Sequence, residues 1–316
     1  QEKEVREYVA GTEPSKPRAD EVYARPSTEF LKLRGEAANG RTRRTLVDLI
    51  RRKRSLLCVG LDTEEHLVPE HFRDERHPVR AFNEAIVEAT HDLAVAYKLN
   101  LAFYEAQGVD GWEDLEATIA YIRSRGDVFI IADAKRGDIG NTARKYAEAF
   151  FDRLGVDAVT IAPYMGRDSI TPFLGRADKW AIVLGVTSNE GALDFQFLSV
   201  DGGRQRLFEH VMRKVAEWGP AANTMFVVGA TRTDVLAQAR ACAPDHFFLV
   251  PGVGAQGGDL NAVLDATMTP DGGLLINSSR GILYAGKDED AIGAARRAAQ
   301  ELQQAMERRM RAKGVL

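Results

Sequence analysis

Four charged residues lie within the six-residue segment Asp133-Ala-Lys-Arg-Gly-Asp138, which follows an apolar run starting at Val128. Side chains alternate along a β-strand, so Asp133 and Lys135 are predicted to point the same way where this strand ends. Gly137 then allows a turn that carries Asp138 into the next loop. Burying so many charges costs several kcal/mol per ion. The cluster is therefore predicted to serve a reaction, in preference to a structural ion pair.

Two further charged residues, Asp62 and Lys98, each end an apolar run upstream of this segment. Either residue alone would fit a solvated strand end. In a parallel barrel, however, the carboxyl ends of the strands meet at one face, which would bring both side chains close to Asp133 and Lys135. The sequence therefore predicts two lysines interleaved with three acids at a single site.

A glycine-rich segment and an arginine predict an anion site. Residues 251–258 include four glycines, which allow backbone N–H groups to approach an anion closely. Arg280, followed by Gly281, offers a planar guanidinium that binds phosphate through two hydrogen bonds. Glycine-rich turns alone fit a structural role equally well, but in combination with Arg280 they favour phosphate.

The elements that must position these residues alternate along the chain from Thr42 onward. Eight short apolar runs, each followed by a helical or connecting segment, predict parallel strands joined by right-handed crossovers. Eight such units over roughly 230 residues match a closed (β/α)8 TIM barrel better than a doubly wound open sheet. The predicted strands are 56–62, 95–100, 128–135, 158–162, 181–187, 225–230, 247–251 and 274–277. The predicted helices are 42–53, 82–93, 115–123, 142–154, 205–218, 235–241 and 288–311.

The chain is predicted to contain one folded domain after an N-terminal stretch of different composition. Residues 1–40 carry three prolines and mixed charges with few clustered aliphatic residues, and they are interpreted as an extension or linker. Residues 41–316 are predicted to form the barrel domain.

Composition narrows the classes of protein to consider. The formal net charge of −4 argues against a general nucleic-acid-binding protein, because phosphate backbones are held by an excess of basic residues. No apolar run approaches the roughly 18 residues of a membrane-spanning helix, and no secretory signal is visible. Cys58 and Cys242, like His66, His71 and His77, lack metal-ligand spacing. We therefore expect a cytoplasmic protein that binds neither a metal nor a membrane.

The motifs of this chain resemble those of the orotidine 5′-phosphate decarboxylase family, from Thr45 to Arg309. The resemblance is strongest to a bacterial branch with longer chains, although Leu99 stands where that branch is expected to have proline. Residues 1–40 lie outside the resemblance; because some relatives are fused to a phosphoribosyltransferase, a fusion remnant is one interpretation of them. The segments that carry the resemblance are Val59-Gly-Leu-Asp62, Tyr97-Lys-Leu-Asn100, Phe103-Tyr-Glu105, Asp133-Ala-Lys-Arg-Gly-Asp-Ile-Gly-Asn-Thr142, Ala162-Pro-Tyr-Met-Gly166, Thr187-Ser-Asn189, Val250-Pro-Gly-Val-Gly-Ala-Gln-Gly257 and Asn277-Ser-Ser-Arg-Gly281.

This resemblance implies the decarboxylation of orotidine 5′-phosphate to uridine 5′-phosphate, the last step of de novo pyrimidine nucleotide synthesis, without a metal or cofactor. Lys135 would donate a proton to C6 of the pyrimidine and stabilise the carbanion that precedes it. Asp133 would face the departing carboxylate. Asp62 and Lys98 would hold ribose hydroxyls, with Lys98 also bridging the acids. An ammonium fixed beside the reacting carbon stabilises negative charge as it develops, so these residue types suit the implied chemistry.

The resemblance also implies the remaining contacts with the nucleotide. Ser188 would contact the pyrimidine amide, and Gln256 would contact the phosphate together with Arg280 and its neighbour Gly281. Asp138 and Thr142 would reach across a homodimer interface to the ribose in the other subunit's site. The expected partners are therefore the nucleotide substrate and a second copy of this chain.

Two alternatives stay open in the sequence. A magnesium-dependent keto-sugar-phosphate decarboxylase or aldolase of the same barrel superfamily shares the Asp-x-Lys-x-x-Asp pattern. As the resemblance has it, those enzymes carry an acidic metal ligand at the end of the second strand, where this chain has the cation of Lys98. A non-catalytic nucleotide-binding barrel is the second alternative, although a protein that had lost its activity would usually have lost one of the charged residues.

Overall fold

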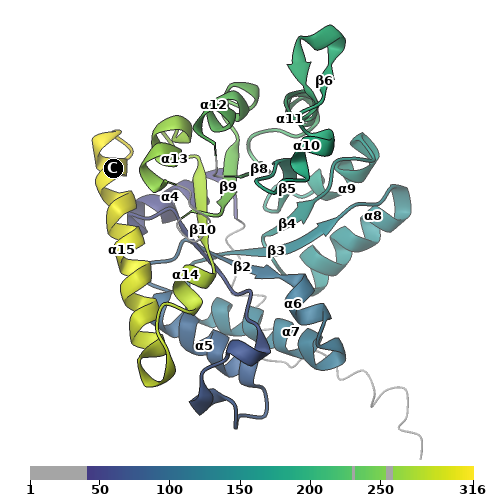
Figure 1. Cartoon of the computed structure of the whole chain (residues 1–316). Helices are drawn as coiled ribbons and strands as arrows, with labels where there is room; N and C mark the ends of the chain where they lie inside the picture. Colours follow the sequence, from purple (N-terminus) through teal and green to yellow (C-terminus); the bar gives the residue numbers. More distant parts are fainter. Residues whose placement is uncertain (1–40, 230–231, 254–258) are drawn as a thin grey trace, which may run out of the picture. The chain divides into compact units, whose positions relative to one another are not determined.

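The computed structural model describes residues 41–229, 232–253 and 259–316. Within these ranges, eight parallel strands close into a barrel in the order β1, β10, β9, β8, β5, β4, β3, β2 (Figure 1). The closed barrel confirms the predicted (β/α)8 fold and excludes the open sheet; the expected extension 1–40 lies outside the described residues. The barrel strands are β1 (Leu57–Gly60), β2 (Ala96–Asn100), β3 (Phe129–Arg136), β4 (Ala158–Ile161), β5 (Trp180–Val186), β8 (Thr224–Val228), β9 (Phe247–Pro251) and β10 (Leu274–Ser278).

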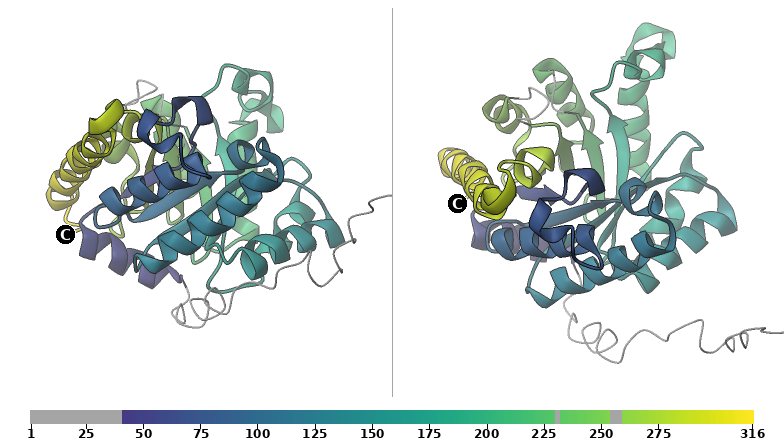
Figure 2. Two further views of the ribbon diagram at one scale, coloured as in Figure 1. Left: turned by 90° about the horizontal axis from the view of Figure 1, so that it is seen from below. Right: turned by 60° about the horizontal axis from the view of Figure 1, so that its bottom comes forward.

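Helices surround the barrel as an outer layer (Figure 2). The first of them shows how the sequence specifies such a helix. Thr42 caps its N-terminus by accepting a hydrogen bond from the Thr45 N–H, and Leu46 and Ile50, one turn apart, are buried against the barrel. The longer helices are α4 (Arg43–Lys53), α5 (Pro78–Thr90), α7 (Gly108–Ser124), α8 (Gly140–Ala147), α11 (Leu207–Trp218), α12 (Thr233–Cys242), α13 (Leu260–Thr267) and α15 (Ala291–Ala312).

The N-terminal end of the barrel is closed by aromatic packing. Phe129, Trp180 and Phe247 each begin a strand, and both Phe129 and Phe247 meet the Trp180 ring edge-to-face with ring centroids 6.0 Å apart. All three are fully buried. This apolar end leaves polar chemistry to the opposite, carboxyl end of the strands.

Among the described residues, no helix is long and apolar enough to cross a membrane.

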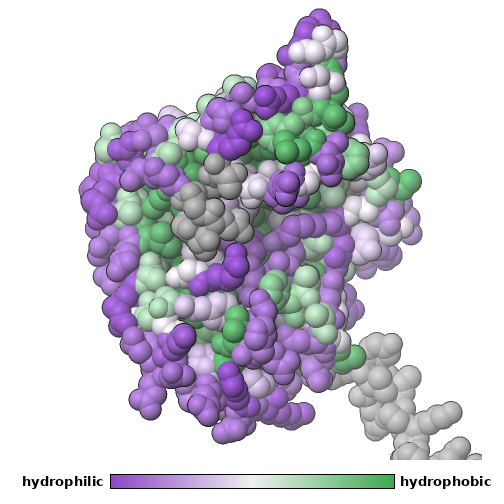
Figure 3. All heavy atoms as spheres, in the orientation of Figure 1, coloured by the Kyte–Doolittle hydropathy of each residue, from purple (hydrophilic) through white to green (hydrophobic). Residues whose placement is uncertain are grey.

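A projecting segment between β5 and α11 was not predicted from the sequence (Figure 1). Its two strands, β6 and β7, are each only two residues long, which is too short to show an alternating pattern. Gly202 and Gly203 adopt positive φ angles at the turn between the two strands. Leu193 and Phe195 are exposed in this segment, and Figure 3 shows apolar residues gathered over its helix. The segment comprises α10 (Ala192–Phe195), β6 (Ser199–Val200) and β7 (Gln205–Arg206).

Candidate active site

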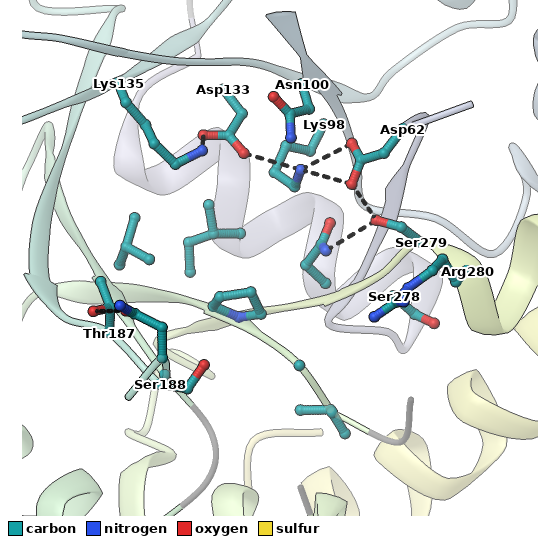
Figure 4. A pocket seen from close by; sticks show the side chains of 18 of the residues that line it. Asp62, Lys98, Asn100, Asp133, Lys135, Thr187, Ser188, Ser278, Ser279 and Arg280 are labelled. Atoms are coloured by element: carbon teal, nitrogen blue, oxygen red, sulfur yellow. Dashed lines mark hydrogen bonds and ion pairs between the residues drawn. The ribbon is translucent and has the colours of Figure 1, made fainter. Parts of the chain in front are cut away.

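A cavity of about 510 Å³ opens at the carboxyl ends of the barrel strands (Figure 4). Asp62 follows β1, Lys98 lies on β2, and Asp133 and Lys135 lie near the end of β3. Figure 4 shows these four side chains in a row along one wall of the cavity. The structure therefore brings together four of the five charged residues that the sequence grouped. The fifth, Asp138, does not line the cavity.

Lys98 lies at the centre of this row. Its Nζ is 3.1 Å from Asp62 Oδ1 and 3.1 Å from Asp133 Oδ2, and the residue is only 4% exposed. Burial alone lowers the pKa of Lys98, but the attraction of the two carboxylates outweighs burial and raises the pKa above its ordinary value. Lys98 is therefore a fixed cation between two acids.

Asp133 lies between the two lysines. Its Oδ1 accepts a hydrogen bond of 2.7 Å from Lys135 Nζ and one of 2.9 Å from Thr160 Oγ1, while Oδ2 faces Lys98. Burial raises the pKa of Asp133, but the attraction of Lys98 and then Lys135 outweighs burial, so that the pKa lies below its ordinary value. Asp133 is therefore ionised and holds both ammonium groups in place.

The backbone of Lys135 departs from regular strand geometry. Its φ angle of +46° is left-handed, which costs on the order of 1–3 kcal/mol for a residue other than glycine. The register between β3 and β4 shifts between Ala132 and Arg136, so β3 bulges here. The side chains of Asp133 and Lys135 are in contact, as predicted. The prediction assumed a regular strand with alternating side chains, whereas the contact is made at a bulge.

Asp62 is held on its other side by two residues, Asn277 and Ser279, that were not predicted to take part in the site. Ser279 Oγ donates to Asp62 Oδ2 at 2.8 Å, and Asn277 Nδ2 donates to Ser279 Oγ at 3.3 Å. Gly60 leaves room for this contact, because a Cβ atom at Gly60 would lie 1.9 Å from Ser279 Oγ. Both residues belong to the segment Asn277-Ser-Ser-Arg-Gly281, which carries part of the family resemblance but does not indicate their contact with Asp62.

Arg280 lies at the mouth of the cavity, at the start of the short helix α14 (Arg280–Leu283). It is exposed, and no acidic side chain in the described ranges pairs with its guanidinium. Arg280 is therefore available to an anion, and Gly281 beside it is exposed as well. Gln256 and the remainder of the predicted glycine-rich loop, 254–258, lie outside the described residues.

Ser188 lines the cavity in the loop after β5, across from the charged row (Figure 4). Its neighbour Thr187 is fixed by Gln196: the Thr187 N–H donates to Gln196 Oε1, and Gln196 Nε2 donates to Thr187 Oγ1, both at 2.8 Å. Gln196 follows α10, in the projecting segment that was not predicted. That segment therefore helps to position the loop that carries Ser188.

Asp138 and Thr142 lie outside the cavity of their own chain. Asp138 Oδ1 accepts a hydrogen bond of 2.7 Å from the Ile139 N–H, and Thr142 is exposed on α8. Three exposed apolar residues lie in this part of the chain and in the loop after β4, and they are Ile139, Tyr164 and Met165. Within one subunit, the two predicted ribose contacts do not join the other site residues.

The arrangement suits the stabilisation of negative charge. A group that becomes negative beside Lys135 Nζ would meet an ammonium that is already oriented by Asp133, so little reorganisation is needed.

Lys98 fills the space between Asp62 and Asp133, where two carboxylates would otherwise attract a metal ion. Among the described residues, no group of three or more histidine, cysteine or acidic residues is arranged to hold a metal.

Comparison with known proteins decides the family. A protein-family model that is described as the orotidine 5′-phosphate decarboxylase / HUMPS family matches residues 55–295. The chain belongs to the orotidine 5′-phosphate decarboxylase / HUMPS family. This membership confirms the resemblance that the motifs indicated.

Relatives named orotidine 5′-phosphate decarboxylase match almost their whole length. The protein of Bacteroides fragilis strain YCH46 is 51% identical over 271 residues, which cover 85% of this chain and 98% of the relative. The protein of Porphyromonas gingivalis strain ATCC 33277 is 50% identical over 276 residues, which cover 87% of this chain and 100% of the relative.

Solved structures of the same family share the fold. The orotidine 5′-monophosphate (OMP) decarboxylase of Leishmania donovani superposes with a TM-score of 0.71 and 40% identity, covering 84% of this chain and 99% of that chain. The UMP synthase of the same organism gives a TM-score of 0.72 and 40% identity, covering 83% of this chain and 56% of that chain.

Proposed function

We propose that this chain catalyses the decarboxylation of orotidine 5′-phosphate to uridine 5′-phosphate, in pyrimidine nucleotide synthesis, without a metal or cofactor. The observation that carries the proposal is the row of ion pairs in the cavity, with Lys98 between Asp62 and Asp133 and Lys135 against Asp133. The names of relatives that share about half of their residues with the chain support the same reaction.

The lining of the cavity supports one orientation of the nucleotide. The phosphate would bind the exposed guanidinium of Arg280 at the mouth, and the ribose hydroxyls would meet Asp62 and Lys98. The pyrimidine amide would meet Ser188 on the opposite wall. C6 of the ring and its carboxylate would then face Asp133 and Lys135. Gln256 is proposed as a second phosphate contact on the strength of its motif alone.

The reaction proceeds at C6 of the pyrimidine. The bond between C6 and the carboxyl carbon breaks, CO2 leaves, and the electron pair stays on C6. Lys135 Nζ stabilises this charge as it forms and then transfers a proton to C6, which completes uridine 5′-phosphate. The Lys135 side chain is 50% exposed in the open cavity, so it can regain a proton from solvent after product release.

The barrier for this reaction is high because the carbanion has no electron sink. Enzymes lower barriers by about 8–23 kcal/mol, and this reaction needs a reduction toward the top of that range. No single contact supplies so much. Binding energy from the remote phosphate must therefore be used to orient the ring against Lys135 and to exclude water.

A homodimer with shared sites is part of the proposal. Asp138 and Thr142 lie outside the cavity of their own chain, beside the exposed apolar residues Ile139 and Met165. A second copy that covers these apolar side chains would bring its own Asp138 and Thr142 to the rim of the first copy's cavity. The ribose of the bound nucleotide would then contact residues from two chains.

The magnesium-dependent alternative is disfavoured by Lys98, a buried cation in the position where such an enzyme would need an acid. The test is the release of CO2 from orotidine 5′-phosphate by the purified chain in excess EDTA. We expect an unchanged rate. Loss of activity in EDTA, with recovery on addition of Mg2+, would contradict the metal-free mechanism.

The same assay tests the non-catalytic alternative. If the chain binds uridine 5′-phosphate tightly but releases no CO2 from orotidine 5′-phosphate, it is a binding protein and the proposed reaction is wrong. We expect both binding and turnover, because all four charged residues of the row are present and paired.

A further inference from the structure

Thr160 is the one polar residue of β4, whose sequence is Ala-Val-Thr-Ile. Its side chain is fully buried, and it does not line the cavity. Neither the sequence motifs nor the proposed reaction assigns a role to it. A hydroxyl placed in an otherwise apolar buried strand needs hydrogen-bond partners, and those partners indicate what Thr160 does.

Both partners of Thr160 belong to the charged row. Its Oγ1 donates a hydrogen bond of 2.9 Å to Asp133 Oδ1 and accepts one of 2.9 Å from the backbone N–H of Lys135. One hydroxyl therefore uses its donor and an acceptor at the same time. It connects the side chain of one charged residue to the main chain of the other.

The strand register explains why a side chain is needed at this point. Ala132 pairs with Val159, and Arg136 pairs with Ile161, so three residues of β3 (133 to 135) stand opposite the single residue Thr160. Regular backbone pairing cannot reach all three. The Lys135 N–H, at the left-handed φ angle of +46°, would be left without a partner in the strand ladder. The Thr160 hydroxyl takes the place of the missing backbone acceptor.

We propose that Thr160 is a positioning residue for the decarboxylation, because its hydroxyl fixes the β3 bulge in the form that directs Lys135 Nζ and Asp133 toward the same point in the cavity. This inference rests on the proposed function and extends it to a residue that does not touch the substrate. Removing the hydroxyl would free the Lys135 backbone and one oxygen of Asp133 together.

The test compares four variants in the CO2-release assay. Thr160→Val removes the hydroxyl and keeps the shape, and Thr160→Ser keeps the hydroxyl. Thr160→Cys has the shape of the serine variant but only a weak hydrogen-bonding group. Thr224→Val is the matched control, since Thr224 is also a fully buried threonine on a barrel strand, and its hydroxyl has no partner among the described residues.

We expect kcat to fall by about 10- to 100-fold in Thr160→Val, because small misplacement of a catalytic group has effects of that size. Binding of uridine 5′-phosphate should change by less than about threefold, since the phosphate and ribose contacts remain. Thr160→Ser and Thr224→Val should stay close to wild type. The Thr160 hydrogen bond also lowers the pKa of Asp133, so the acid limb of the kcat profile should move to higher pH in Thr160→Val.

The outcomes separate this inference from the reaction itself. If wild type releases no CO2, the proposed function is wrong and the role of Thr160 is wrong with it. If wild type is active but Thr160→Val matches Thr224→Val in kcat and pH profile, only the role of Thr160 is wrong. Should the valine variant fail to fold, the serine and cysteine variants make the same comparison: a lower kcat in cysteine supports the role, and equal values contradict it.

Discussion

Lys98 and Asp133 are both buried and charged, and each stabilises the charged form of the other. Lys98 is surrounded by Asp62 and Asp133, and Asp133 is surrounded by Lys98 and Lys135. A buried ion without a partner would lose its charge, whereas here the pKa of the lysine is raised and that of the acid is lowered. The ammonium of Lys135 is therefore oriented before a substrate arrives, which is the condition for electrostatic catalysis.

The opposite pKa shifts predict how stability depends on pH. The pKa of Asp133 is lowered on folding, so its contribution is present above the ordinary carboxyl pKa of about 3.9 and is lost as pH falls through the folded value. The pKa of Lys98 is raised, so its contribution is present below about 10.4 and is lost as pH rises through the folded value. Both contributions are complete between about pH 5 and pH 10.

Asp133→Asn tests the acid side of this window. At pH 7 the variant should be less stable by about 1–3 kcal/mol, since Lys98 keeps Asp62 and Lys135 is half exposed. This difference should shrink as pH falls below about 4, because the wild-type carboxyl is then protonated in the unfolded state while its lowered pKa keeps it ionised in the folded state. Urea unfolding of both proteins at several pH values measures it. A difference that stays constant down to pH 3 would show that folding does not lower the pKa of Asp133.

At the residue scale, the sequence predicted the four charged residues of the row, but it did not predict the residues that hydrogen-bond to them. Asp62, Lys98, Asp133 and Lys135 were found because each interrupts or ends an apolar run, a signal that is visible in one dimension. Thr160 acts at the bulge of β3, and Ser279 reaches Asp62 because β10 pairs with β1. No local pattern in the sequence specifies either contact. A buried threonine in a strand can be assigned a role only when the strand register shows which residues lie opposite it.

At the scale of elements, the eight barrel strands were predicted within two residues at most of their ends, because buried parallel strands are nearly continuous in apolar residues. The helix α13 (Leu260–Thr267) was missed, and so was the projecting segment that contains α10. Both are short, and periodicity needs length to be recognised. The second omission matters for function, since Gln196 beside α10 fixes Thr187 in the Ser188 loop.

The end of β1 carries a steric requirement that can be tested. Gly60→Ala would place a Cβ atom 1.9 Å from Ser279 Oγ, so Ser279 must leave Asp62 or the strand must shift. We expect a loss of about 1–3 kcal/mol in stability and a fall in kcat/KM of about tenfold. The control is Gly175→Ala, where no atom lies within 4 Å and φ is −71°. Equal effects of the two substitutions would contradict the account of Gly60.

At the scale of the whole molecule, the cavity of one chain lacks two residues of the predicted site. Asp138 and Thr142 lie outside the cavity, and Tyr164 nearby is 91% exposed. Exposed apolar side chains that lie together are typical of an interface. A dimer related by a two-fold axis would complete two sites at once, because each chain would supply the other with the same residues.

Mixing two inactive variants tests this arrangement. Lys135→Ala and Asp138→Ala should each be inactive alone. In a mixed dimer, one site has lost both residues and the other retains both, so one site in two is intact. With random exchange, half of the dimers are mixed, and activity should recover to about a quarter of wild type. No recovery, in a sample where mass spectrometry demonstrates mixed dimers, would exclude the shared site.

The most direct test of the central claim measures CO2 release from carboxyl-labelled orotidine 5′-phosphate by Lys135→Ala. The variant loses both the proton donor, worth about 10²–10⁴-fold, and the charge that stabilises the carbanion, so kcat should fall by at least about 10⁴-fold. Binding of uridine 5′-phosphate should be nearly unchanged. Lys214→Ala, which removes an exposed lysine paired with Glu217 on the outer helix α11, should behave as wild type. CO2 release by Lys135→Ala at the rate of Lys214→Ala would contradict the assignment of Lys135 as the catalytic acid.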